Sequence, residues 1–229
     1  MNKYDLYVIG AGGTGTYFLK EAARYLDALG NSSPIMTAAI VDGDKVEDKN
    51  LSRQSFMEED IGHYKSAVMA DALYSAFPCG ARWAAVGEYL TDLSLLNSGR
   101  HIPLVIGCVD NHGCRLLLEK FFAKSKDIIY FDSANEFTTG AVVFAYKQGG
   151  TVVSPCRSHY FPEILKGDTR QRTEMSCSEL NTVAPQHITA NMMAGQILLT
   201  EFCSLMEGKP HPGMVTFDTA EFSSEDHKA

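Results

Sequence analysis

Residues 1–135 alternate between short, continuously apolar runs and longer stretches with apolar residues at helical spacing. Phe18, Ala22 and Leu29, for example, fall on one side of a helix that Gly30 ends. Continuous apolar runs are typical of strands buried on both faces of a parallel sheet. We therefore expect an α/β fold in which helices cover both faces of a mostly parallel sheet. The expected strands are 5–9, 36–41, 104–109 and 128–132. The helix after the first strand ends at Leu29, and the helices after the second and third strands span 65–76 and 115–123.

The pattern changes after residue 135. Apolar runs at 140–146 and 151–153 flank Gly149 and Gly150, which predicts an antiparallel hairpin, and 214–218 predicts a last strand. We expect antiparallel strands to continue the sheet in this half of the chain. The other expected features are a polar loop at 154–182, a long helix from Pro185 to about Met206, and a frayed tail at 221–229.

Composition excludes several classes of protein. The chain of 229 residues is 45% hydrophobic and 21% charged, which is typical of a globular protein rather than a disordered one. Its net charge of −8 at pH 7 offers no basic surface to nucleic acid or to an anionic membrane. The six cysteines form no C-x-x-C pair, and no apolar run approaches the roughly 18 residues that span a bilayer. We expect a cytoplasmic protein that binds neither nucleic acid nor membranes.

A glycine-rich turn joins the first expected strand to the first expected helix. Its glycines match G-x-G-x-x-G, and Asp42 ends the next strand, where a carboxylate commonly accepts ribose hydroxyls. Glycine allows a phosphate to approach the N–H groups and the partial positive charge of a helix N-terminus. This predicts a Rossmann-like nucleotide-binding half over 1–135, although the same turn could serve tight strand–helix packing alone. The glycines of the turn are Gly10, Gly12, Gly13 and Gly15.

The block that follows favours a nucleoside triphosphate over a nicotinamide dinucleotide. It reads DGDKVEDKNLSRQ from Asp42 to Gln54, and Lys65 comes soon after. Cations such as Arg53 and Lys65 beside the β- and γ-phosphates stabilise a departing pyrophosphate, and a dinucleotide has no such need. Asp110 ends the strand at 104–109, where it could hold Mg²⁺ between phosphates or cap the next helix.

The glycine turn together with the D-x-D-x-V-x-x-x-N-L-x-R-Q string resembles the ThiF/MoeB/HesA family, relatives of the ubiquitin-activating enzymes. The resemblance implies an ATP·Mg-dependent adenylyltransferase. Its substrate would be the C-terminal carboxylate of a ubiquitin-like or sulfur-carrier-like protein that ends in glycine. Carried over by position, Asp42 would bind ribose, Asp44 would lie near the metal and Asp110 would bind Mg²⁺. The residues implied at the phosphates are Asn50, Arg53, Gln54 and Lys65.

The resemblance also implies a thiol step. Cys177 lies in a polar stretch before the last expected helix, where relatives carry a cysteine on a flexible loop. It could receive the activated acyl group or form a persulfide, or it could be structural. The catalytic residues expected from the sequence are Arg53, Lys65, Asp110 and Cys177.

Two departures from relatives change what we expect. Relatives often hold a structural zinc with two C-x-x-C pairs, whereas Cys156, His159 and His227 do not complete a four-ligand site here, so we expect no structural zinc. Relatives also bring an arginine to the phosphates on an N-terminal arm, whereas Lys3 is the sole cation before Asp5. The compact, zinc-less form resembles the ThiF-like proteins of bacterial PRTRC gene systems.

The last expected helix bears on assembly. It places several apolar side chains within two turns, and relatives dimerise through this region, so we expect a homodimer. The residues concerned are Met192, Met193, Gly195, Gln196 and Leu199.

Two other functions remain open at this point. The glycine turn is compatible with an NAD-dependent oxidoreductase, against which Arg53 and Lys65 argue. The chain could also be a non-catalytic partner in an activating-enzyme complex, although such partners usually lose the arginine, the lysine or the metal-binding aspartate. If the protein does not bind NAD(H), the first of these alternatives is excluded.

Overall fold

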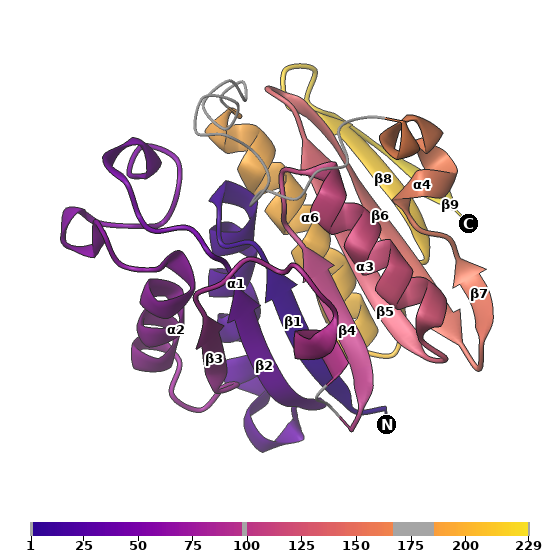
Figure 1. Ribbon diagram of the computed structural model, residues 1–229, viewed down its shortest axis with the longest axis horizontal. Helices are drawn as coiled ribbons and strands as arrows, with labels where there is room; N and C mark the ends of the chain where they lie inside the picture. The colour runs from indigo at the N-terminus through magenta and orange to yellow at the C-terminus, as the bar shows by residue number, and fades with distance from the viewer. Residues whose placement is uncertain (1, 98–99, 167–185, 229) are drawn as a thin grey trace.

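Helices lie on both faces of one nine-stranded sheet in the computed structural model, which describes residues 2–97, 100–166 and 186–228 (Figure 1). The strand order is β3-β2-β1-β4-β5-β6-β8-β9, and β7 pairs with β6 beside this path. The strands from β3 to β5 are parallel, and β6 to β9 continue the sheet in antiparallel fashion. The α/β fold expected from the sequence is therefore confirmed.

The parallel half agrees closely with the pattern of apolar runs. The strand expected at 104–109 ends at Gly107, so that Cys108 and Val109 lie beyond the sheet. A short strand at Trp83–Val86 was not expected. Its apolar run is only four residues long, and Ala84 and Ala85 within it are exposed. The elements are β1 (Tyr4–Ile9), α1 (Gly13–Leu29), β2 (Ile35–Val41), α2 (Lys65–Ala76), β3 (Trp83–Val86), β4 (Ile102–Gly107), α3 (His112–Lys124) and β5 (Ile128–Asn135).

The antiparallel half corrects one expectation. Residues 221–229 are not a frayed tail, because Ser223–Lys228 forms β9 and pairs with β8 from Asp218 back to Gly213. Backbone hydrogen bonds hold this strand, and its polar side chains suit an edge strand and carry no apolar pattern. The predicted hairpin around Gly149 and Gly150 is confirmed. The elements are β6 (Thr139–Gln148), β7 (Thr151–Ser154), α4 (Arg157–Tyr160), α6 (Ile188–Met206), β8 (Gly213–Asp218) and β9.

Short 3-10 turns complete the fold. They lie at Gly30–Ser32, Asp48–Asn50, Glu58–Asp60, Ser94–Asn97 and Pro162–Leu165. The stretch expected as a loop at 154–182 thus contains α4 and one of these turns in its described part. The expected helix start at Pro185 lies outside the described residues, and α6 begins at Ile188 with His187 as its N-cap.

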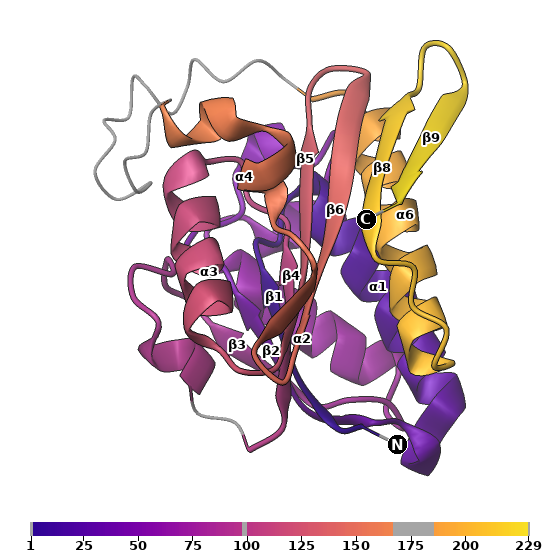
Figure 2. The same ribbon diagram turned by 90° about the vertical axis from the view of Figure 1, so that its right-hand side faces the viewer.

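Side chains of each central strand point alternately into two apolar layers. Leu6 and Val8 of β1 pack on the side of α1 and α6, whereas Tyr7 and Ile9 pack on the side of α3. Figure 2 shows the sheet edge-on between these helices. Phe18 of α1 and Phe202 of α6 meet edge to face with ring centroids 5.6 Å apart, which joins the two helices over the sheet.

The contact between α1 and α6 changes the argument for a dimer. A Cβ on Gly195 would lie 2.7 Å from the ring of Tyr17, so this glycine is covered inside the chain. Met193 and Leu199 are partly buried against the core, which leaves Met192 and Gln196 exposed. The apolar surplus expected on this helix is therefore smaller than its sequence indicates, and the homodimer stays a prediction.

A buried aspartate closes the sheet at the amino ends of its parallel strands. Thr37 Oγ1 donates to Asp5 Oδ1 at 2.6 Å, and the backbone N–H of His101 donates to Oδ2 at 2.9 Å. Burial alone would raise the pKa of Asp5, but these hydrogen bonds and His101 lower it overall.

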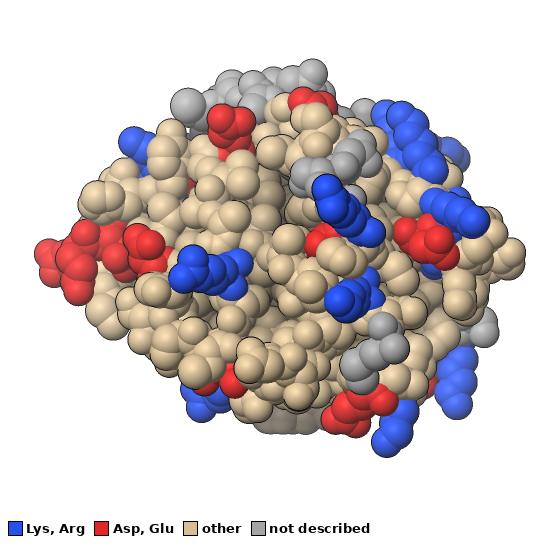
Figure 3. Space-filling view, turned by 90° about the horizontal axis from the view of Figure 1, so that it is seen from below, with Lys and Arg blue, Asp and Glu red and all other residues tan. Residues whose placement is uncertain are grey.

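On the face seen from below, basic and acidic side chains are scattered among uncharged residues (Figure 3).

A second buried aspartate joins the two halves of the sheet. Asp132 of β5 is 1% exposed and receives Arg115 Nε of α3 at 3.3 Å and Arg157 Nε of α4. Arg157 Nη2 also donates to the carbonyl of Ala141 at 2.7 Å, while Arg115 Nη2 donates to the carbonyls of Val109 and Ser133. The aspartate therefore anchors α3, α4 and β6 around the carboxyl end of β5.

None of the helices within the described part of the chain is long and apolar enough to cross a bilayer.

Replacing Asp132 with alanine should destabilise the protein by about 3–5 kcal/mol, because two buried guanidinium groups would lose their counter-ion. Urea denaturation followed by circular dichroism measures this change. Asp71→Ala on the exposed face of α2 is the matched control and should change stability by less than about 0.5 kcal/mol. Equal stability of the two variants would show that Asp132 does not hold the halves together.

Candidate functional site

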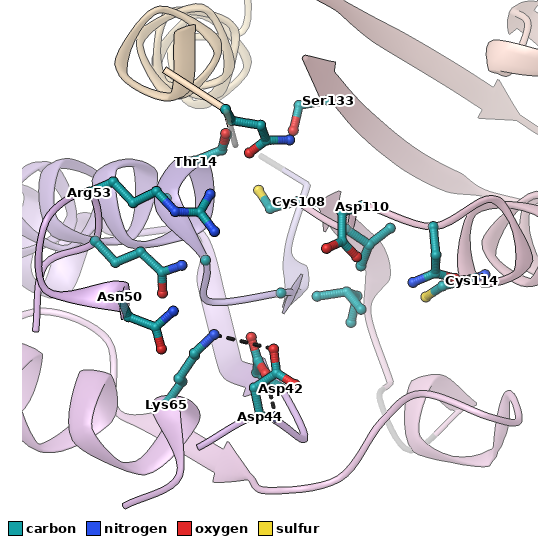
Figure 4. A pocket seen from close by; sticks show the side chains of 18 of the residues that line it. Thr14, Asp42, Asp44, Asn50, Arg53, Lys65, Cys108, Asp110, Cys114 and Ser133 are labelled. Carbon is teal, nitrogen blue, oxygen red and sulfur yellow. Dashed lines mark hydrogen bonds and ion pairs between the residues drawn. The ribbon is translucent and has the colours of Figure 1, made fainter. Parts of the chain in front are cut away.

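A cavity of about 490 Å³ opens where the parallel strands end. Its walls come from the segments that follow β1, β2, β3 and β4 and from the carboxyl end of β5. This is the edge at which open α/β sheets collect their ligands, and the volume is that of a small-molecule site. Figure 4 shows the side chains that converge on it.

The glycine turn serves both packing and the cavity. Gly10 has a φ of +96°, and a Cβ there would lie 2.6 Å from the carbonyl oxygen of Cys108. A Cβ on Gly15 would lie 2.1 Å from the carbonyl oxygen of Gly10. The helix α1 can therefore pack this closely against the turn only because position 15 has no side chain. Gly13 is also tightly packed, since a Cβ there would lie 2.3 Å from Asn191 Nδ2, whereas a Cβ on Gly12 would have open space around it. Tight packing therefore explains three glycines of the four, and Gly10, Gly12 and Gly13 all line the cavity.

The start of α1 faces the same cavity. Gly12 is its N-cap and provides no side-chain oxygen to the first turn. The first N–H groups of a helix carry a partial positive charge and have no partners within the helix. The cavity is thus bordered by a helix end suited to an anion.

Asp42 ties β2 to the glycine turn. Its Oδ2 accepts the N–H of Ala11 at 2.6 Å, and its Oδ1 accepts the N–H of Asp44 at 2.8 Å. Burial raises the pKa of Asp42, and the negative charge of Asp44 raises it further, while Lys65 and the two N–H groups oppose the shift. The residue lines the cavity directly beside the turn, where the sequence places a ribose-binding carboxylate.

Lys65 is a buried cation in the cavity wall. It is 5% exposed, and its Nζ lies 3.2 Å from Asp44 Oδ2. Lys65 is also the first residue of α2, where the helix dipole disfavours a positive charge. Asp44 compensates that charge, and the backbone N–H of Lys65 returns to the carbonyl of Asp44 at 2.9 Å. Figure 4 shows the ammonium directed at the paired aspartates.

The other expected phosphate residues lie on the same side of the cavity. Asn50 is buried and uses its Oδ1 to accept the N–H of Glu47, which fixes the 3-10 turn. The guanidinium of Arg53 lines the cavity and has no ion-pair partner among the described residues. Gln54 Oε1 is buried and, within the described part of the chain, has no hydrogen-bond partner. A bound group could satisfy both side chains.

Asp110 faces these residues from the other side of the cavity (Figure 4). The helix-cap alternative is taken by its neighbour, because Asn111 Oδ1 accepts the N–H of Cys114 at 2.8 Å. Among the described residues, no three acidic, histidine or cysteine side chains come together as a metal site. Mg²⁺ could fit only as an ion shared between Asp110 and phosphates, which is its usual mode with nucleotides.

Several lining residues were missed by the sequence analysis. Tyr89 and Leu90 follow β3, a strand that the apolar pattern did not indicate, and Ser133 and Asn135 end β5 beyond its apolar run. Cys108 and Cys114 also line the cavity, and burial raises the pKa of each thiol to about 12. These two cysteines are therefore protonated at neutral pH and are poor nucleophiles.

One expected site residue, Cys177, lies outside the described residues. The structure brings the other expected residues to one cavity, with the exception of Gly15, which supports the turn from behind.

Comparison with solved structures finds the same fold in several proteins. MccB of E. coli, solved with AMPCPP and MccA, superimposes with a TM-score of 0.69 at 15% identity over 98% of this chain. MccB of E. coli solved with ATP gives 0.69 at 15% over 99%, and PaaA gives 0.69 at 16% over 99%. The chain spans 63–64% of the length of these proteins. No curated protein matches by sequence.

The family comparison covers the whole chain. The model of the ThiF family matches residues 1–229, which include the glycine turn, the block from Asp42 to Lys65 and Asp110. The chain belongs to the ThiF family.

Proposed function

We propose that this protein uses ATP to adenylate the C-terminal carboxylate of a peptide or protein. The observation that carries the proposal is that one cavity brings together an uncapped helix N-terminus, the cations of Arg53 and Lys65, and the carboxylate of Asp110. MccB, which shares the fold, has been solved with ATP and with MccA, which supports a nucleotide and a peptide as the two substrates.

The reaction would proceed by in-line displacement. A carboxylate oxygen of the substrate attacks the α-phosphorus of ATP, the bond from that phosphorus to the β-bridging oxygen breaks, and pyrophosphate leaves with the electron pair. Charge grows on the pyrophosphate as it departs, so fixed cations beside it lower the barrier. In this proposal Arg53, which has no ion-pair partner among the described residues, and Lys65 take this role.

The remaining residues bind and orient the nucleotide. Gly12 and Gly13 let phosphate oxygens approach the N–H groups of α1, and Asp42 would accept the ribose hydroxyls. Mg²⁺ bound by Asp110 and the phosphates would neutralise part of the triphosphate charge. The side-chain oxygen of Gln54, which has no hydrogen-bond partner among the described residues, would accept a hydrogen bond from the nucleotide or the substrate.

The sequence is the basis for more specific proposals about the partner, the assembly and the thiol step. We propose a ubiquitin-like or sulfur-carrier-like partner that ends in glycine, with a homodimer as the active form and Cys177 as an acceptor of the acyl group. ATP–pyrophosphate exchange against proteins with different C-terminal residues tests the partner. A non-catalytic role is disfavoured because Arg53, Lys65 and Asp110 all line one cavity.

ATP with Mg²⁺ should raise the melting temperature, and NADH should not. At 100 times its dissociation constant, a ligand that binds only the folded state adds about 2.7 kcal/mol of stability. Differential scanning fluorimetry with each ligand separates the two outcomes. Stabilisation by NADH and not by ATP would reverse the assignment in favour of an oxidoreductase.

Arg53→Ala and Lys65→Ala should each slow ATP–pyrophosphate exchange by tenfold or more, since about 1.4 kcal/mol of lost transition-state contact is tenfold in rate. Lys45→Ala is the control, because this lysine lies on the same loop but places its ammonium over the ring of Tyr64, 5.2 Å from the centroid. Melting without nucleotide checks that all three variants fold. Normal exchange in both site variants would remove these cations from the mechanism.

Two glycine variants should separate packing from binding. Gly15→Ala forces a Cβ against the carbonyl of Gly10 and should destabilise the protein by about 1–3 kcal/mol. Gly12→Ala has room and an extended backbone with φ −82°, so it should melt normally yet bind ATP more weakly. Calorimetric titration of both variants measures binding, and unchanged affinity in Gly12→Ala would place the phosphates elsewhere.

A further inference from the structure

Tyr89 has no role in the function described so far, although it lines the cavity. It follows β3 and lies over Gly43, where a Cβ would come within 2.8 Å of its ring. This close contact fixes the ring against the backbone between Asp42 and Asp44. The hydroxyl of Tyr89 donates a hydrogen bond to Asp44 Oδ1.

The two oxygens of Asp44 serve two different donors. Oδ1 receives the phenol of Tyr89, and Oδ2 receives the ammonium of Lys65 at 3.2 Å. The side chain of Lys65 is 6% exposed and that of Asp44 is 20% exposed, so water screens the pair only in part. The three side chains form one chain of contacts, Tyr89–Asp44–Lys65, that ends at the cavity.

We propose that Tyr89 is a positioning residue that sets how strongly Lys65 engages the β- and γ-phosphates of ATP. The inference rests on the proposed function. The phenol neutralises part of the carboxylate charge and holds Asp44 at the side of the ammonium. Lys65 therefore keeps its place at the N-terminus of α2 while its remaining N–H bonds stay available to phosphate oxygens.

Loss of the hydroxyl acts on the lysine through Asp44. The carboxylate keeps its full charge, so it holds the ammonium of Lys65 more tightly and withdraws it from phosphate. The binding of a triphosphate is therefore weakened. A nucleoside monophosphate lacks the β- and γ-phosphates and is not affected.

The test compares ATP with AMP in Tyr89→Phe by isothermal titration calorimetry at a fixed Mg²⁺ concentration. The ring and its seat on Gly43 are kept, so the variant should fold. We expect the affinity for ATP to fall about tenfold, as for one hydrogen bond to a charged group, and that for AMP to stay within twofold. Tyr64→Phe is the matched control, because its ring covers Gly87 in the same way.

A double-mutant cycle identifies the route of the effect. If Tyr89 acts through Lys65, adding Tyr89→Phe to Lys65→Ala should cost no further ATP affinity. An equal loss of ATP and AMP, unchanged ATP affinity, or an additive double mutant would overturn the inference while wild type still binds ATP. Failure of wild type to bind ATP would overturn the proposed function and the inference together.

Discussion

The carboxyl end of β5 depends on one buried aspartate shared by two arginines. Asp132 lies at the point where the sheet changes from parallel to antiparallel, and its two partners come from α3 and α4. A carboxylate 1% exposed would be costly without cations, and each arginine would be costly without it. Because Arg115 also binds the carbonyl of Val109, the residue before Asp110, this cluster fixes the far wall of the cavity.

The opposite wall is the segment from Asp42 to Ser66, whose two ends are joined by hydrogen bonds. Asp42 holds Ala11 and Asp44, Lys65 returns to Asp44, and Ser66 Oγ donates to the carbonyl of Asp42 at 3.2 Å. Most of the charged groups at the cavity are thus partnered before any ligand arrives. Arg53 stands apart, since it has no ion pair among the described residues. Within the described part of the chain, the cavity therefore combines a rigid frame with one cation that has no ion pair.

The sequence predicts the parallel half well because strands buried on both faces must be continuously apolar. It misses β3, whose Ala84 and Ala85 are exposed, and β9, which backbone pairing holds despite polar side chains. The block from Asp42 to Lys65 is local in the sequence, so its residues could be assigned to one site. Tyr89, Ser133 and Asn135 reach the cavity only through long-range packing, and no local pattern marks them.

The contact between Gly43 and the ring of Tyr89 means that these two positions can change only as a pair. Any side chain at 43 would occupy the space of the aromatic ring, and any smaller side chain at 89 would leave a hollow above the glycine. An engineer who reshapes this wall for a different nucleotide must therefore redesign two segments that lie far apart in the chain. Replacing only the loop after β2 would change position 43 and leave the ring of Tyr89 without its matching surface.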